Sequence, residues 1–199
     1  DAAGKHLFPG VVDVHQHWGI YNELGEDASS ESQASAQGGV TTGITYMRTG
    51  AYYMNRTGPY REVFPDILAA AEGRSYVDYA FHVAPILQEH IEEIPDLIGE
   101  FGVPSFKIFM FYGSHGLHGR SSDQSSFLMI PEDQSYDLAH FEFVMRGIQA
   151  ARERFPDLAE EISLGLHCET AEIMTAYQKI VEADDSLTGL RAYSASRPP

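Results

Sequence analysis

Four side chains that can bind metal ions or react with electrophiles lie within or at the ends of apolar runs. His15 and His17 stand two residues apart in "PGVVDVHQH", at the end of a predicted strand over 11–17. His167 ends a later apolar run in "GLHCET", and Lys107 interrupts the run "PSFKIFMFYG". Side chains two residues apart on a strand share a face, so two imidazoles there can chelate one metal ion.

Simpler explanations of the histidines stay open on the residues alone. The first pair, with Asp13 on the same face, could be a surface or hydrogen-bonded pair. Cys168 points to the face opposite His167, and we expect it to be a small core residue rather than a ligand. Glu169 points the same way as His167, where it could support that histidine or face solvent.

Lys107 is the least expected residue in its run, because a buried ammonium is costly unless it is paired or neutralised. A lysine at this place could extend its ammonium to the end of the strand. Alternatively, a desolvated neutral amine can react with carbon dioxide to give a carbamate. Such a carbamate carries two oxygens and could bridge two metal ions.

Strand-like runs alternate with helical patterns, which predicts βα units and a parallel sheet. The predicted strands cover 11–17, 40–47, 77–86, 104–113 and 162–168. The predicted helices cover 65–72, 91–101, a stretch from 138 to at least 148, and 171–183, with a weak helical signal over 29–38. Residues 113–133 and the tail from 191 are expected to be loops. A barrel of this type needs eight such units and about 250 residues, so the five units here predict either a smaller open sheet or part of a barrel.

Three of the predicted helices carry an apolar stripe that should face the sheet. The stripes consist of Ile91, Ile94, Ile98 and Phe101, then Leu138, Phe141, Met145 and Ile148, and finally Ile173, Tyr177 and Ile180.

The composition excludes some classes of function. The 199 residues carry 13 basic and 29 acidic side chains, a net charge of −16 that argues against nucleic-acid binding and against an anionic membrane surface. No apolar run approaches the roughly 18 residues of a membrane span. The N-terminal stretch lacks the apolar core of a signal peptide, and the single cysteine excludes an intrachain disulfide. These features favour a cytoplasmic protein.

The motifs "PGVVDVHQH", "GGVTT", "FKIFMFY", "LHCET" and "SASRPP", in this order, resemble the cyclic amidohydrolases: hydantoinase, dihydropyrimidinase, allantoinase and dihydroorotase. The resemblance covers nearly the whole chain and implies an α/β fold of the parallel (β/α)8 TIM-barrel type, with about five βα units present. It implies a hydrolase that opens the C–N bond of a small cyclic amide or imide through a metal-bridging hydroxide. It also implies a homo-oligomer for the full-length protein.

Roles follow from the resemblance residue by residue. His15 and His17 match ligands of the first of two divalent metal ions, for which zinc is expected, and His167 matches a ligand of the second. Lys107 matches a lysine that carbon dioxide converts to a carbamate bridging both ions. Tyr112 matches a catalytic tyrosine that binds the carbonyl of the substrate and its developing oxyanion.

The chain departs from the family pattern in several places. The next metal-binding histidine and the aspartate of the family have no match within residues 1–199, nor have its N-terminal sandwich strands. The chain is therefore expected to be an internal piece, a partial barrel domain that cannot catalyse efficiently by itself. The stretch 113–133 is longer than expected and contains His115 and His118, either in a solvated insertion or in a lid.

Dihydroorotases usually place an arginine after the first histidine pair to bind the carboxylate of the substrate. Trp18 and Gly19 stand there instead, and Arg48 at the end of the second predicted strand could substitute for the arginine. The sequence therefore favours a hydantoinase or dihydropyrimidinase. Dihydroorotase or allantoinase activity, a non-catalytic structural relative, and a mononuclear hydrolase with an unmodified lysine remain as alternatives.

Overall fold

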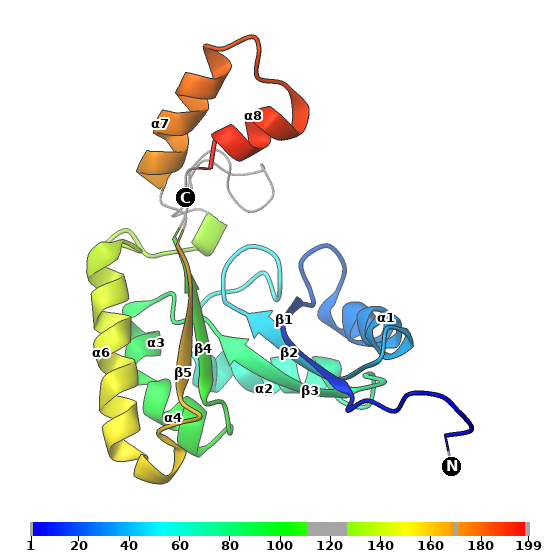
Figure 1. Cartoon of the computed structure of the whole chain (residues 1–199). Helices are drawn as coiled ribbons and strands as arrows, with labels where there is room; N and C mark the ends of the chain where they lie inside the picture. The colour runs from blue at the N-terminus through cyan, green and yellow to red at the C-terminus, as the bar shows by residue number, and fades with distance from the viewer. Residues whose placement is uncertain (1, 111–126, 169–170, 198–199) are drawn as a thin grey trace.

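A computed structural model describes residues 2–110, 127–168 and 171–197. Five strands form one curled sheet in which every neighbouring pair runs parallel (Figure 1). The strands follow each other in chain order: β1 (Val11–His17), β2 (Val40–Met47), β3 (Asp78–Val83), β4 (Ser105–Phe109) and β5 (Ser163–His167). Each overlaps its predicted range, so the predicted βα fold of barrel type, with five units, is confirmed.

Helices cover the outer side of the curled sheet and leave its inner side open (Figure 1). The helices are α1 (Leu24–Gln37), α2 (Tyr60–Ala71), α3 (Gln88–Glu92), α4 (Ile94–Gly99) and α6 (Leu138–Arg154), followed by a 3-10 turn at Pro156–Leu158. Two more, α7 (Ala171–Glu182) and α8 (Gly189–Ala195), stand apart beyond the end of β5.

The core fills the layer between the sheet and its outer helices. Phe64 and Ile67 of α2, Leu97 of α4, and Phe106 and Ile108 of β4 are almost fully buried there. By contrast, β1 leaves its three valines at least half exposed, namely Val11, Val12 and Val14. The apolar packing that fixes the strands therefore lies on one side of the sheet, and the inner side is available for polar side chains.

The start of α2 differs from the prediction. We expected the helix to begin at Pro65, but it begins at Tyr60, and Pro65 lies inside it. Glu93 allows this earlier start, because its carboxylate accepts hydrogen bonds from the backbone N–H groups of Tyr60 (2.7 Å) and Arg61 (3.1 Å). A negative charge at these unpaired donors stabilises the first turn of a helix.

Replacing Glu93 with alanine should lower the free energy of unfolding by about 2 kcal/mol, because two backbone N–H groups at the start of α2 lose their acceptor. Urea denaturation measures the change. Glu92→Ala is the matched control, since this neighbouring carboxylate is exposed to solvent. Equal losses in the two variants would contradict the role of Glu93.

Other helices differ from the prediction because apolar spacing alone does not show where a helix is interrupted or which side it buries. The stripe from Ile91 to Phe101 is divided at Glu93 into α3 and α4. The weak signal over 29–38 belongs to the 14-residue helix α1. The tail predicted as a loop contains most of α8, because the two prolines at 198 and 199 lie beyond the end of this helix.

The buried sides of α6 and α7 also differ from the predicted stripes. On α6, Phe141 and Ile148 are buried as predicted, but Leu138 and Met145 are exposed. The rest of its buried side consists of His140, Val144 and Ala151. On α7 the predicted stripe is open to solvent: Ile173, Tyr177 and Ile180 are 51%, 39% and 62% exposed. The reason is the position of α7, which extends away from the sheet rather than lying on it (Figure 1).

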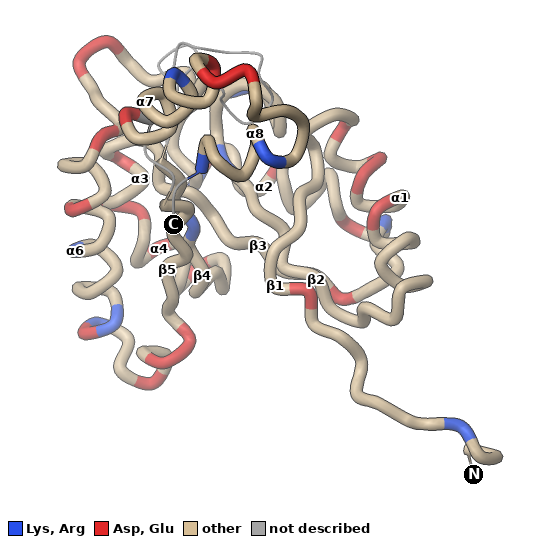
Figure 2. The backbone as a smooth tube through the Cα atoms, turned by 45° about the horizontal axis from the view of Figure 1, so that its top comes forward, with Lys and Arg blue, Asp and Glu red and all other residues tan. Residues whose placement is uncertain are grey.

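Acidic residues are spread along α1, α6 and the α7 region of the chain rather than gathered in one place (Figure 2). Across the described residues, none of the helices combines the length and the apolar character that crossing a bilayer requires.

Candidate active site

The histidines of β1 are positioned by an irregularity in the sheet. The pairing of β1 with β2 shifts between Asp13 and Gln16, so one extra residue of β1 is accommodated there. Gln16 crosses over Gly43, where an added Cβ would lie only 1.7 Å from its amide nitrogen. The rings of His15 and His17 lie with their centroids 4.8 Å apart and nearly perpendicular. The strand thus presents two imidazoles side by side.

Each of these imidazoles is held by a partner from another element. Nδ1 of His15 lies 2.8 Å from Nε2 of His82 on β3, and one of these two nitrogens donates the shared proton. Nδ1 of His17 lies 3.0 Å from the hydroxyl of Tyr53. A ring fixed through Nδ1 is oriented for binding a metal through Nε2.

Partial burial favours the neutral, metal-binding form of His82 and His15. It lowers the pKa of His82 to about 4, and the charges of His15, Lys107 and His17 act in the same direction. Burial also lowers the pKa of His15, to which Lys107 and His167 add while Asp13 opposes them. Neutral imidazole is the form that coordinates metals.

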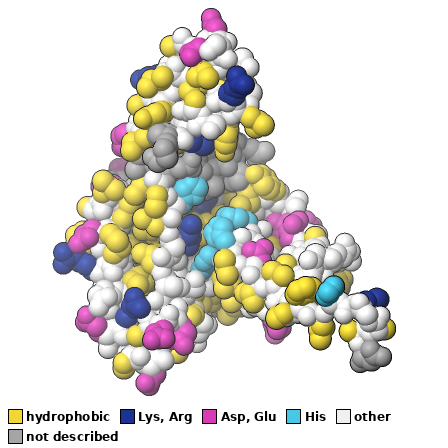
Figure 3. Space-filling view, in the orientation of Figure 1, with side chains coloured by type: hydrophobic (Ala, Val, Ile, Leu, Met, Phe, Trp, Pro, Cys, Tyr) yellow, Lys and Arg dark blue, Asp and Glu magenta, His cyan; other side chains and the backbone are white. Residues whose placement is uncertain are grey.

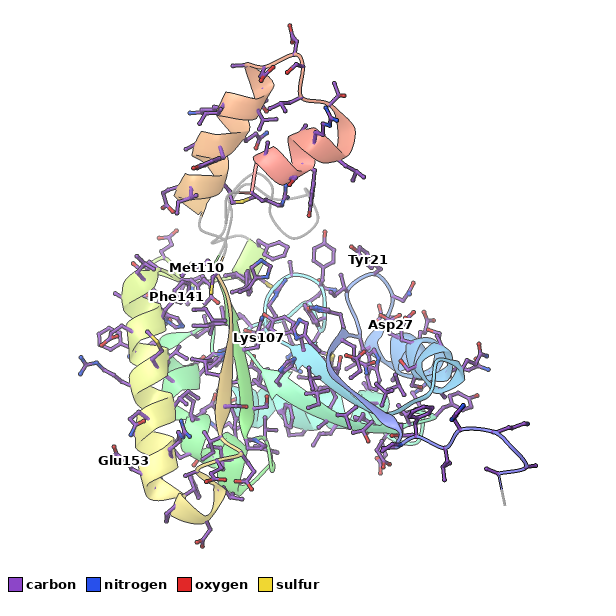
Figure 4. The ribbon with its side chains drawn as sticks, in the orientation of Figure 1. Tyr21, Asp27, Lys107, Met110, Phe141 and Glu153 are labelled. Carbon is purple, nitrogen blue, oxygen red and sulfur yellow. The ribbon has the colours of Figure 1, made fainter. Side chains whose placement is uncertain are left out.

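Lys107 lies on the inner side of the sheet, opposite Gly165 in the β4–β5 register (Figure 4). A side chain on Gly165 would approach Cδ of Lys107 to 3.1 Å, so the glycine leaves the lysine its space. Burial lowers the pKa of Lys107, while the nearby Cys168 raises it. The lysine is half-buried rather than fully buried, which makes its presence in an apolar strand less costly than the sequence suggested.

His167 ends β5, paired with Phe109 of β4. The electrostatic interaction with His167 lowers the pKa of His15, so these two side chains lie near each other. Figure 3 shows histidine side chains gathered on this inner side, next to basic groups. The four predicted metal ligands therefore face one hollow from three strands, although within the described ranges no three His, Cys, Asp or Glu side chains converge as a ready metal site.

The remaining predicted residues have different outcomes. Tyr112, His115, His118 and Glu169 lie outside the described residues, so their roles stay predictions. The prediction that Cys168 belongs to the core was wrong, because it is exposed at the end of β5, whose outward residues have little packed over them.

The sequence reasoning missed His82. Its signal was present: a lone histidine within "DYAFHV", one residue before the end of a largely apolar strand, at the same sheet edge as the predicted ligands. The spacing of histidines along one strand could not reveal it, because the partner of His82 is on another strand.

Asp27 fixes the loop that follows His17 (Figure 4). Its carboxylate accepts hydrogen bonds from the backbone N–H of Gly19 (2.7 Å) and from the side-chain amide of Asn22 (2.8 Å). The carbonyl of Gly19 in turn accepts from the backbone N–H of Tyr53 (2.6 Å), the residue that holds His17. The loop is thus bound to Tyr53, whose hydroxyl contacts His17.

Replacing Asp27 with alanine should therefore lower the free energy of unfolding by about 2 kcal/mol, because a buried N–H loses its acceptor. It should also weaken metal binding at His17 by disturbing the Tyr53 contact. Chemical denaturation and metal titration measure the two effects. Glu31→Ala, which changes an exposed residue of the same helix, should alter neither stability nor metal binding. Unchanged metal binding in the Asp27 variant would contradict the predicted effect on His17.

Comparison with solved structures supports the fold. No protein-family model matches the chain. Two solved D-hydantoinase structures, one from a Bacillus sp. AR9, each superpose with a TM-score of 0.63 over 96% of this chain and 36% of theirs, at 20% and 23% identity. At such identity the match supports the fold alone: a curled parallel sheet of the (β/α)8 type.

Sequence relatives then give closer similarities. A D-hydantoinase from Geobacillus stearothermophilus is 34% identical over 117 residues, which are 56% of this chain and 24% of that protein. An allantoinase from Desulfitobacterium hafniense (strain Y51) is 30% identical over 203 residues, covering 100% of this chain and 38% of the relative. The chain is similar to this D-hydantoinase and this allantoinase, and it spans well under half the length of either.

Proposed function

We propose that this chain forms part of a metal-dependent hydrolase that opens a cyclic amide. The observation that carries the proposal is the arrangement of His15, His17, Lys107 and His167 around one hollow at the inner side of the sheet. Relatives named D-hydantoinase and allantoinase support cyclic amides as the substrate class.

The donors suit divalent metal ions. His15 and His17 would hold the first ion through Nε2, and His167 would hold the second. The lowered pKa of Lys107 favours the neutral amine that can take up carbon dioxide, and the resulting carbamate would offer one oxygen to each ion. When bound, zinc ions supply an activated water and polarise the amide carbonyl. We assign the binding of that carbonyl to Tyr112.

Among the ring substrates, hydantoins and dihydropyrimidines are the first candidates. Allantoin is a further candidate. The allantoinase matches the whole chain, whereas the D-hydantoinase matches 56% of it. Dihydroorotate and a non-catalytic role remain as further outcomes of the test.

The full-length protein should bind about two divalent ions per chain and hydrolyse hydantoin, dihydrouracil or allantoin. Metal analysis and assays with these three rings and with dihydroorotate, compared between wild type, His15→Ala and the exposed His6→Ala, test this. His15→Ala should lose metal and activity together, and His6→Ala should keep both. A protein without metal and without activity towards any of the rings would identify a structural relative. One metal with an unmodified Lys107, read by mass spectrometry, would identify a mononuclear hydrolase.

A further inference from the structure

The predicted metal ligands come from two parts of the sheet that are weakly joined. The histidine pair belongs to β1, whereas Lys107 and His167 belong to β4 and β5. β2 pairs with every residue of β3, but between β3 and β4 the register holds a single pair, Val83 with Phe106. Side-chain contacts across this joint therefore affect how the two groups of ligands lie relative to each other.

The buried ring of His82, on β3, makes one contact towards each of these parts. Its Nε2 lies 2.8 Å from Nδ1 of His15, and its Nδ1 lies 3.5 Å from Oγ of Ser105 on β4, a long hydrogen bond. His82 and Ser105 directly precede the two paired residues of their strands, so they share one face of the sheet. The three side chains thus form a row that leads from β1 to β4.

One arrangement of protons lets both rings of this row donate. When both rings are neutral, each carries one proton. A proton on Nδ1 of His15 is accepted by Nε2 of His82, which then carries its own proton on Nδ1 and donates it to Oγ of Ser105. In the reverse arrangement His15 carries its proton on Nε2, for which none of the described residues offers an acceptor. The first arrangement uses both N–H groups and leaves a lone pair on Nε2 of His15.

The position of Lys107 favours the same arrangement. Ser105 and Lys107 stand two residues apart on β4 and face the same side, so the row ends beside the lysine. The charge of Lys107 adds to burial in lowering the pKa of His15 and of His82, so the lysine lies near both rings. An N–H at Nε2 of His15 is unfavourable next to a positive group, whereas a lone pair there is favourable.

We propose that His82, with Ser105 behind it, is a positioning residue that holds the proton of His15 on Nδ1 and so keeps Nε2 ready for a metal ion before any ion binds. The assignment of the proton stands by itself, and the use of Nε2 rests on the proposed function. One consequence is specific to this row: a serine on β4 should influence an ion that is held from β1.

The proton is located by two-bond proton–nitrogen NMR correlations of the metal-free full-length protein, labelled with nitrogen-15 at histidine. Loss of signals in His15→Gln assigns those of His15. The wild type should carry the His15 proton on Nδ1. His82→Leu removes the acceptor and should move the proton to Nε2, the position that a histidine side chain favours in water. His82→Gln offers Oε1 as an acceptor and should keep the proton on Nδ1.

Zinc affinity is measured on the same variants by competition with a chromophoric chelator. Loss of the group behind a metal-binding histidine costs roughly 10–100-fold in affinity, so His82→Leu should weaken the first ion by about that factor and His82→Gln should recover most of it. Ser105→Ala should weaken it less than His82→Leu does. Ser163→Ala is the matched control, because this exposed serine pairs with Ser105 in the β4–β5 register and should change nothing. Ser105→Ala and His82→Gln keep the test decisive if His82→Leu does not fold.

Three results would overturn the role of His82. The first is a His15 proton on Nε2 in the wild type. The second is a proton position or a zinc affinity that is the same in His82→Leu as in the wild type. The third is an equal loss of affinity in His82→Leu and His82→Gln, which would assign the effect to packing of the ring. If the wild type binds no zinc, the hydrolase proposal fails, and the NMR signals alone decide whether His82 sets the proton of His15.

Discussion

Replacing Lys107 with alanine should remove metal from the full-length protein and slow hydrolysis of its cyclic amide more than about 100-fold, since loss of groups that merely support a metal ligand already costs roughly 10–100-fold. The reason is that the lysine, as a carbamate, would supply an oxygen to each ion. Metal analysis and steady-state kinetics measure the two losses. Acetate added to the variant should restore part of both, because its two oxygens can take the place of the carbamate.

Lys179→Ala is the matched control for this change, since Lys179 is an exposed lysine on α7. It should keep metal and activity at wild-type values. Lys107→Arg distinguishes the effect of the positive charge from the effect of carbamate formation, because a guanidinium keeps the charge but does not form the carbamate. Full metal content in Lys107→Arg would contradict the bridging role and support a mononuclear site.

Stability should fall as the pH drops from about 6.5 towards 4, with His90 contributing about 3 kcal/mol of the loss. His90 is fully buried, and burial lowers its pKa to about 4, while the bond to the Gly58 carbonyl raises it and the charge of His140 lowers it. Its Nδ1 accepts from the backbone N–H groups of Ile86 and Leu87, and its Nε2 donates to Gly58. A proton on Nδ1 would therefore face two donors.

The sign of the effect comes from these contacts. Below pH 6.5 the unfolded chain takes up a proton on His90 that the folded chain refuses until about pH 4, so protons favour unfolding in this interval. Urea denaturation at pH 7 and at pH 4.5 measures the effect. His90→Gln should reduce the difference between the two values, whereas the exposed His6→Ala should leave it unchanged. His82 and His140, whose pKa values are also lowered, account for a remaining slope. An unchanged pH difference in His90→Gln would contradict the assignment.

The strands, and with them the positions of the predicted ligands in the sheet, were accessible from the sequence because strands depend on local patterns. The runs ending in His17 and His167 are apolar and short, and the parallel arrangement then brings their ends to one edge. The β1–β2 irregularity was not accessible, because the extra residue of β1 is accommodated by the lack of a side chain at Gly43, 27 residues beyond Gln16.

Contacts between distant elements could not be predicted from the sequence. The early start of α2 depends on Glu93, and the orientation of His15 depends on His82. The stripe of α7 was misjudged for a related reason, because an apolar stripe shows that a helix has a side to cover but not which element covers it. The carbamate on Lys107 and the metal ions stay predictions.

The order of the strands in the sheet has a consequence for how the protein is made. Each strand pairs with the one synthesised just before it, from β1 and β2 to β4 and β5. Every pairing therefore closes a loop of limited length, which keeps its entropic cost small. A chain emerging from the ribosome can add one strand and one helix at a time to an existing edge. The histidine pair of β1 is then joined by His82, Lys107 and His167 in this order, so the four predicted ligands come together only when β5 has paired.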